Sequence, residues 1–171
     1  ARMLKNAIIS ANIEIHDMSL KNPDLSGMGT TALTVLVKGE TAVIAHVGDS
    51  RAYLIDEEIT QLTRDHSVVQ SLLESGKISE EDAKVHPRKN VITRALGAEE
   101  NIVSDSCETT LSKGQTLLLC TDGLSSYAES GQILNVFKSA KNEDITDELI
   151  ELANKNGGGD NITVVTLTRE E

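Results

Sequence analysis

The stretch from Gln115 to Leu124 constrains the fold of this chain most strongly. Its first part, Thr116–Cys120, is mainly apolar and predicts a buried strand. Asp122 and Gly123 follow directly after that strand. A carboxylate there is positioned by the sheet yet faces solvent, and the glycine allows a tight turn or a close approach to a ligand. Asp122 is therefore the first candidate for chemistry, although an Asp-Gly pair after a strand also serves simply as a turn.

Segments that alternate between apolar and polar residues predict an architecture rich in hairpins. Two of them flank the turn residues Gly39-Glu40, and two more flank Asp56-Glu57. Connections of this length are typical of paired antiparallel strands. Besides Thr116–Cys120, the predicted strands are Thr30–Lys38, Thr41–Val47, Arg51–Ile55, Glu58–Leu62, Val91–Leu96, Ile102–Leu111 and Ile162–Thr168.

Other segments have the apolar spacing of helices. The first runs from Arg2 to Leu20 and is amphipathic, so its apolar stripe is expected to pack on the rest of the protein. Ser79 and Asp82 resemble a capping box that opens a short helix, and Asp144 is the expected N-cap of the last helix. The stripe of the first helix consists of Leu4, Ala7, Ile8, Ala11, Ile15 and Met18, and the other predicted helices are Val68–Ser75, the one after Ser79, Ser130–Ala140 and Asp144–Asn156.

Length and composition indicate a single soluble globular domain, residues 1–171. A formal net charge of −11 and an aromatic share of 2% argue against a nucleic-acid partner, because phosphate backbones are bound by Lys and Arg and single strands by stacking aromatics. Cys107 and Cys120 are expected to be buried free thiols in a reducing compartment. No apolar run has the length of a membrane span and no signal peptide is visible, so the expected location is cytoplasmic.

Three aspartates stand next to a glycine at predicted strand ends: Asp49, Asp122 and Asp160. If the strands are neighbours, these carboxylates can converge within one or two strand spacings. Like charges at that range raise one another's proton affinity unless a cation lies between them. An all-oxygen site favours Mg²⁺ or Mn²⁺ over Zn²⁺, and paired divalent ions activate water for attack on phosphorus. For Asp49 alone, an Asx turn is the alternative.

The histidines divide into two groups. His16 lies on or beside the apolar stripe of the first helix and is expected to be structural. His66 and His86 flank two short predicted helices that resemble an excursion over the rim of a sheet, and such excursions often border active sites. For both residues a capping or surface role and a functional role stay open.

Six short motifs follow one another over nearly the whole chain: Gly29-Thr30-Thr31, Gly48-Asp49-Ser50-Arg51, Leu62-Thr63-Arg64-Asp65-His66, Ile92-Thr93-Arg94-Ala95-Leu96-Gly97, Thr121-Asp122-Gly123-Leu124 and Gly159-Asp160-Asn161-Ile162-Thr163. In this order they closely resemble the bacterial branch of the type 2C, metal-dependent (PPM) serine/threonine protein phosphatases. The resemblance implies an α+β fold, a four-layer α/β/β/α sandwich of two antiparallel sheets flanked by helices, with a mobile flap at residues 67–90. It also implies hydrolysis of phosphoserine and phosphothreonine in proteins by a metal-activated water, with two central Mn²⁺ or Mg²⁺ ions and a weaker third.

The resemblance also assigns roles to individual residues. Asp122 matches a ligand of the central metal pair, Asp160 matches a second such ligand, and Asp49 matches a ligand of the third, weaker site. The family often has an aspartate where Ser126 stands, so a third ion is expected to bind more weakly here. Supporting positions at the site are Asn161, Gly123, Ser126 and His66.

Two elements of the family pattern have no match in the sequence: a strand whose Arg holds the substrate phosphate, and an Asp-Gly element whose Asp bridges the central metals. The chain is therefore expected to be an N-terminally truncated, incomplete catalytic domain. The alternative is a catalytically silent, phosphatase-like regulatory or binding module. A third option, a phosphatase of a sigma-factor regulator, is disfavoured by the motifs at Gly48–Arg51 and Thr63–His66.

The expected partners follow from the same reasoning. They are phosphoprotein substrates of a cognate serine/threonine kinase, with no nucleic acid and no membrane. Strands missing from a sheet leave unpaired edges, so self-association through exposed sheet edges is also expected.

Overall fold

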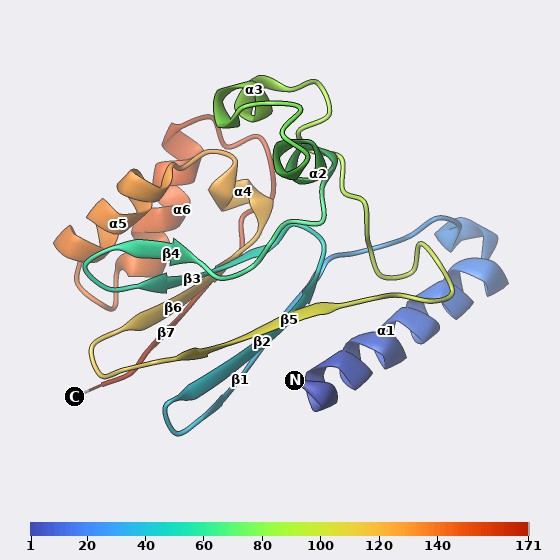
Figure 1. The fold of residues 1–171 in the computed structure, drawn as a ribbon, viewed down its shortest axis with the longest axis horizontal. Coiled ribbons are helices and arrows are strands. Elements are labelled where there is room, and N and C mark those ends of the chain that lie inside the picture. The colour runs from blue at the N-terminus through green and yellow to red at the C-terminus, as the bar shows by residue number, and fades with distance from the viewer. Residues whose placement is uncertain (171) are drawn as a thin grey trace. The chain divides into compact units, whose positions relative to one another are not determined.

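The computed structural model describes residues 1–170, which fall into two compact units. Unit 1 comprises residues 1–36, 43–49 and 64–107, and unit 2 comprises residues 37–42, 50–63 and those from Glu108 onward. Figure 1 traces the elements along the chain. They are α1 (Arg2–Lys21), η1 (Pro23–Leu25), β1 (Ala32–Lys38), β2 (Thr41–Val47), β3 (Arg51–Ile55), β4 (Ile59–Gln61), α2 (Val68–Glu74), α3 (Glu80–Val85), β5 (Asp105–Thr110), β6 (Thr116–Cys120), α4 (Asp122–Ser125), α5 (Ser130–Ser139), α6 (Ile145–Lys155) and β7 (Val164–Thr168).

The strands form two sheets, in the orders β1-β2-β5 and β4-β3-β6-β7. Together with the helices they confirm the predicted α+β class. Within the second sheet every neighbouring pair is antiparallel, and Leu118 of β6 pairs with Tyr53 on one side and Thr166 on the other. Because β6 has a hydrogen-bonded strand on each side, all but one of its residues are buried. The buried strand predicted at Thr116–Cys120 is confirmed.

The core of unit 2 lies between the second sheet and the helices α4, α5 and α6 (Figure 1). The strands contribute Tyr53 and Ile55 from β3 and Leu118 and Cys120 from β6. Each pair is spaced by two residues and therefore points to the same face of the sheet. The helices and the turn after α4 contribute Leu124, Ala128, Ile133, Ile145, Leu149 and Ala153. This core fixes the end of β6 from which Asp122 follows.

In unit 1, α1 packs through a line of residues that includes Ile8, Asn12 and Ile15. Asn12 is 1% exposed, and its Oδ1 accepts a hydrogen bond from the Gly97 N–H at 2.8 Å. Its Nδ2 donates to the carbonyls of residues 99 and 100, so the buried amide is fully satisfied. Part of the predicted apolar stripe is wrong, since Ala7 is exposed and Met18 is 53% exposed. Both lie off the line along which α1 contacts its unit.

Three local predictions need correction. The segment Val91–Leu96 is not a strand, because Ile92 and Leu96 form isolated bridges to separate segments and no continuous ladder can grow. The residues Asp122 and Gly123 after β6, for which a simple turn was one alternative, begin the single-turn helix α4. Asp144 occupies the N-cap position of α6, but its backbone is helical (φ −99°, ψ −12°) and its side chain makes no cap hydrogen bond. An N-cap side chain normally caps from extended backbone, as Ser79 does in the confirmed capping box of α3.

The expected burial of both thiols is found in full only at Cys120. Both cysteines are free, with Cys120 buried and Cys107 half-buried, and burial raises the pKa of the Cys107 thiol. Over residues 1–170, no helix combines the length and the apolar character needed to cross a membrane.

Candidate metal centre

β6 and β7 pair in antiparallel fashion. The segment that follows β6 and the segment that precedes β7 therefore lie together at one end of the sheet. Cys120 pairs with Val164, and the Thr121 N–H extends the ladder by donating to the Thr163 carbonyl at 3.1 Å. The Thr121 hydroxyl accepts a hydrogen bond from the Thr163 N–H at 3.0 Å and donates to the Asn161 carbonyl at 3.2 Å. The chain after β6 is therefore joined by hydrogen bonds to the chain before β7.

Gly123 allows a still closer approach of these two segments. It is buried at the second position of α4, and a Cβ placed on it would overlap the Asn161 carbonyl oxygen and lie 2.8 Å from the carbonyl carbon. Only glycine leaves room for a backbone this near. As a result Asp122, the first residue of α4, and Asp160, the neighbour of Asn161, lie at the same edge of the sheet.

The two carboxylates act on one another. Burial raises the pKa of Asp122, and the charge of Asp160 raises it further. Hydrogen bonds from backbone N–H groups and the charge of Arg51 oppose this rise. Asp160 is exposed, and its Oδ1 accepts a hydrogen bond from the Asn161 N–H at 2.7 Å. The repulsion predicted from the sequence for neighbouring carboxylates is therefore present at Asp122 and Asp160.

Arg51 is a residue whose role the sequence did not indicate. It pairs with Cys120 across β3 and β6, which places it beside the strand end that leads to Asp122. Its Nη1 donates to the Tyr53 hydroxyl at 3.2 Å. Arg51 thus supplies a positive charge on the β3 side of the carboxylates.

The donor chemistry of this edge fits a hard divalent cation. Mg²⁺ keeps several of its waters and is commonly bound by one or two carboxylates, so Asp122 and Asp160 suffice for a first anchor. A cation would also relieve the repulsion that raises the pKa of Asp122. Among residues 1–170, however, no group of at least three His, Cys, Asp or Glu side chains is arranged to hold a metal. The residues therefore fit an ion held by two carboxylates and water.

Asp49 belongs to unit 1. It is half-buried directly after Gly48, whose backbone has φ of +103° and whose missing side chain leaves room for Thr31. The role of Asp49 as a metal ligand stays a prediction. Of the three predicted aspartates, the structure thus brings Asp122 and Asp160 together within unit 2.

His66 holds the backbone beside Asp49. It is 5% exposed, and its Nδ1 accepts a hydrogen bond from the Gly48 N–H at 3.1 Å. Because Nδ1 is the acceptor, the neutral ring carries its proton on Nε2, which donates to Asp105 Oδ2 at 3.1 Å. Arg94 Nη1 contacts the same Asp105 through Oδ1 at 3.1 Å. This network gives His66 a structural role beneath the Gly48 turn.

His46 is a buried residue that the sequence did not single out. Its ring stacks on His66 with centroids 4.8 Å apart and an interplanar angle of 17°. Its Nε2 donates to the Arg64 carbonyl at 2.9 Å, whereas its Nδ1 is buried without a hydrogen-bond partner. The signal available in the sequence was a histidine within the apolar strand Thr41–Val47, which is unusual for a buried strand.

The pKa of His66 predicts how stability depends on pH. Burial lowers this pKa, the hydrogen bond to Asp105 opposes the change, and the charges of Arg94 and His46 lower it further. In the unfolded chain His66 titrates near its ordinary pKa of 6.5. As the pH falls through that value the unfolded state takes up a proton that the folded state does not, so stability is lost on acidification.

We therefore expect urea unfolding to show a loss of stability between pH 7.5 and pH 5.5 that is smaller in His66→Gln. His86→Gln is the matched control, because the Nδ1 of half-buried His86 merely accepts a hydrogen bond from the Arg88 N–H within its own turn. Equal pH dependence in wild type and His66→Gln would contradict this assignment.

The remaining predicted residues lie as follows. Ser126 is exposed at the C-cap of α4, four residues beyond Asp122. His16 is structural, as expected, with Nδ1 3.0 Å from the Gly97 carbonyl. His86 is the C-cap residue of α3, and its Nδ1 accepts a hydrogen bond from the Arg88 N–H.

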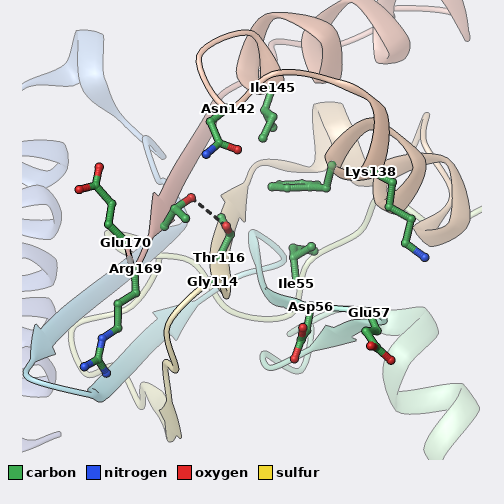
Figure 2. A pocket seen from close by; sticks show the side chains of 12 residues that line it. Ile55, Asp56, Glu57, Gly114, Thr116, Lys138, Asn142, Ile145, Arg169 and Glu170 are labelled. Carbon is green, nitrogen blue, oxygen red and sulfur yellow. Dashed lines mark hydrogen bonds between the residues drawn. The ribbon is translucent and has the colours of Figure 1, made fainter.

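A separate cavity of about 550 Å³ lies at the other end of β6 and β7 (Figure 2). Thr116 and Thr168 line it, with their hydroxyls hydrogen-bonded at 2.8 Å, and Phe137 and Ile145 contribute apolar walls. Figure 2 shows the charged groups of Lys138 and Arg169 directed away from the centre of the cavity. Because it opens at the Thr116 end of β6, this cavity is distinct from the carboxylate pair after Cys120.

Comparison with known proteins identifies the family. Residues 1–162 match the family Protein phosphatase 2C. The serine/threonine phosphatase stp of Listeria monocytogenes serotype 4b (strain F2365) is 42% identical over 169 residues, which are 98% of this chain and 67% of that protein. The crystal structure of the serine/threonine phosphatase Stp1 from Staphylococcus aureus superposes with a TM-score of 0.95 at 36% identity, over 99% of this chain and 68% of that one.

A further solved structure is the catalytic domain of the serine threonine protein phosphatase PstP in complex with 2 manganese ions. It has a TM-score of 0.86 and 36% identity, over 95% of this chain and 68% of that one. Nothing in these comparisons supports a catalytically silent module. The chain belongs to the protein phosphatase 2C family, the metal-dependent serine/threonine protein phosphatases.

Proposed function

We propose that Asp122 and Asp160 together hold a divalent cation, Mn²⁺ or Mg²⁺, with which the protein hydrolyses phosphoserine and phosphothreonine in its substrates. The observation that carries this proposal is the meeting of the two carboxylates at one sheet edge, where Asp160 raises the pKa of Asp122. The PstP structure that contains manganese supports an ion of this class. When bound, such an ion supplies positive charge to the phosphoryl group and lowers the pKa of a water for attack on phosphorus.

The chain's own residues prepare the site. Backbone N–H groups, including that of Gly123, hydrogen-bond the Asp122 carboxylate and hold its orientation, and the Asn161 N–H does the same for Asp160. Arg51 adds a positive charge that favours the ionised form of Asp122. In a chain of net charge −11 these groups and the cation would together offset the repulsion of an anionic substrate.

Finer assignments rest on the family resemblance and on local features. For the metals, they are two central ions and a third, weaker ion at Asp49, to whose binding the neutral Ser126 would add no charge. Asn161, Gly123 and His66 would have supporting roles. The chain would form one phosphatase-like domain spanning residues 1–171, with a flap at residues 67–90. Within residues 67–90, α3 begins at its capping box. We further propose cytoplasmic action on phosphoproteins of a cognate serine/threonine kinase, in signalling, without nucleic acid or membrane as partner.

Self-association through a sheet edge belongs to the same set of proposals. β7 is the terminal strand of its sheet in the described chain, and its residues Val165 and Leu167 are 53% and 37% exposed. An exposed apolar edge strand favours pairing with another strand. Light scattering across a concentration series tests this, and a monomer at every concentration would rule it out.

The experiment for the main proposal measures phosphate release from a phosphoserine, a phosphothreonine and a phosphotyrosine peptide with Mn²⁺, with Mg²⁺ and with EDTA. We expect metal-dependent release from the first two peptides and none with EDTA, at a low rate because the described residues offer only a pair of carboxylates for the ion. Asp160→Ala is expected to remove the metal-dependent release. Release that is unaffected by EDTA would overturn the proposal, and Mn²⁺ binding without any release would favour the silent module.

A further inference from the structure

Tyr127 lies against the glycine run that precedes Asp160. It follows α4 in the chain, is half-buried, and packs against the core of unit 2. Its ring is close to the glycine at position 157, where an added Cβ would lie 3.1 Å from Cε1. At Gly159 an added Cβ would overlap the Tyr127 hydroxyl oxygen and lie 3.3 Å from Cζ. The ring therefore lines the path of the backbone that leads to Asp160.

The reason for a glycine at position 159 is this contact. Gly157 and Gly158 have φ of 138° and 54°, which favour glycine by backbone conformation. Gly159 is not among the glycines with positive φ, so its backbone could accommodate a side chain. What excludes a side chain at Gly159 is the Tyr127 hydroxyl.

Both ends of the glycine run are tied to the same turn. The Asn156 Nδ2, just before the run, donates to the Tyr127 carbonyl at 2.7 Å. The Tyr127 N–H itself donates to the carbonyl of Leu124, which is fully buried within α4. Since α4 begins at Asp122, one short, core-anchored turn carries Asp122 and also contacts the loop that carries Asp160.

We propose that Tyr127 is a positioning residue that fixes Asp160 relative to Asp122. A run of three glycines has little conformational preference of its own, so the separation of the two carboxylates needs an external support. The Tyr127 ring supplies it from the side of the core. This inference rests on the proposed binding of a divalent cation by Asp122 and Asp160, and it assigns to Tyr127 no contact with the ion or the substrate.

The test is a double-mutant cycle between Tyr127 and Gly159, read as Mn²⁺ affinity by calorimetric titration of the chain. Gly159→Ala is expected to lower the affinity about tenfold, in the range of residues that orient metal ligands. In Tyr127→Phe the obstructing oxygen is gone, so adding Gly159→Ala to that variant should restore most of the affinity. Independent effects of the two substitutions, with no such restoration, would overturn the proposal.

A second comparison separates positioning from core packing. Phe137 is also partly buried against the core of unit 2, but it lines the cavity at the other end of β6. Tyr127→Leu and Phe137→Leu should both lower the free energy of unfolding, and only Tyr127→Leu should weaken Mn²⁺ binding. Equal Mn²⁺ affinity in the two variants would contradict a positioning role.

A third readout does not depend on metal. The Asp160 amide cross-peak in a ¹⁵N–¹H NMR spectrum should shift in Gly159→Ala and return toward its wild-type position in the double variant. If the wild-type chain bound no Mn²⁺, the proposed metal site would fail, while the amide shifts would still decide whether Tyr127 fixes the loop. An Asp160 amide that is insensitive to both substitutions would overturn the inference by itself.

Discussion

Replacing Asp122 with alanine is expected to lower the Mn²⁺ affinity of the chain by on the order of 100-fold or more. The substitution removes one of the two carboxylates that meet at the end of β6, whereas loss of a residue that only orients a ligand costs about 10–100-fold. Calorimetric titration, or the decrease of the free Mn²⁺ signal in electron paramagnetic resonance, measures the effect. Asp160→Ala should behave similarly, because an ion held by two carboxylates depends on both.

Asp144→Ala is the matched control for this prediction. Asp144 is exposed in the same unit, and its side chain makes no capping hydrogen bond to α6. Its removal therefore lowers the net negative charge as much as Asp122→Ala does without touching the sheet edge. If both variants bound Mn²⁺ as the wild type does, the ion would not be held at Asp122.

Without metal, Asp122→Asn is expected to stabilise the folded protein, although the same substitution weakens Mn²⁺ binding. A carboxyl whose pKa is raised by folding contributes stability that is complete below its unfolded pKa of 3.8 and that is lost as the pH rises through the folded pKa. At neutral pH the ionised Asp122 therefore destabilises the fold. Asn at this position removes the charge, so we expect a higher urea midpoint together with weaker Mn²⁺ binding.

The approach of Asp122 to Asp160 could be predicted from the sequence because the first follows one well-patterned strand and the second precedes another. The apolar run placed the strand at Thr116–Cys120 and alternation placed the strand at Ile162–Thr168, and antiparallel pairing then brings the end of the first to the start of the second. The glycine next to each aspartate pointed to close backbone contact, which the structure has at Gly123. Local pattern and tertiary pairing agree at this edge.

The long-range contacts of the buried histidines and of Tyr127 could not be predicted in this way. The stack of His46 on His66 and the hydrogen bond from His66 to Asp105 join residues distant in sequence. The separation of these residues in the sequence follows neither the helical nor the strand period, so the sequence pattern does not indicate that they are in contact. The same holds for Tyr127 and Gly159, whose contact depends on how α4 and the loop after α6 pack.

The wrong predictions share a cause as well. Val91–Leu96 has the composition of a strand, but its bridges at Ile92 and Leu96 lead to different partner segments, and pairing is a property of the partners as much as of the strand. Met18 fits a helical stripe by spacing, yet the side of α1 that is buried was decided by contacts such as those of Asn12.

Gly123→Ala is expected to destabilise the protein by about 3 kcal/mol, the upper part of the usual range for overpacking a tight contact. Alanine ordinarily favours a helix over glycine, and Gly123 lies within α4. The opposite result follows here because the new Cβ would overlap the Asn161 carbonyl oxygen, and backbone cannot move aside as a flexible side chain does. The displaced Asn161 would also carry Asp160 away from Asp122, so Mn²⁺ affinity should fall together with stability.

Gly131→Ala provides the matched control, since Gly131 is likewise the second residue of its helix, α5. It is exposed, and a Cβ placed on it would meet no atom within 4 Å. Its replacement should raise the free energy of unfolding by about 0.5–1 kcal/mol, the ordinary gain of alanine over glycine in a helix. The difference between the free energies of unfolding of the two variants, measured in urea, thus separates the effect of the contact with Asn161 from that of helix propensity. If Gly123→Ala were as stable as Gly131→Ala, the close approach that joins Asp122 to Asp160 would not exist in solution.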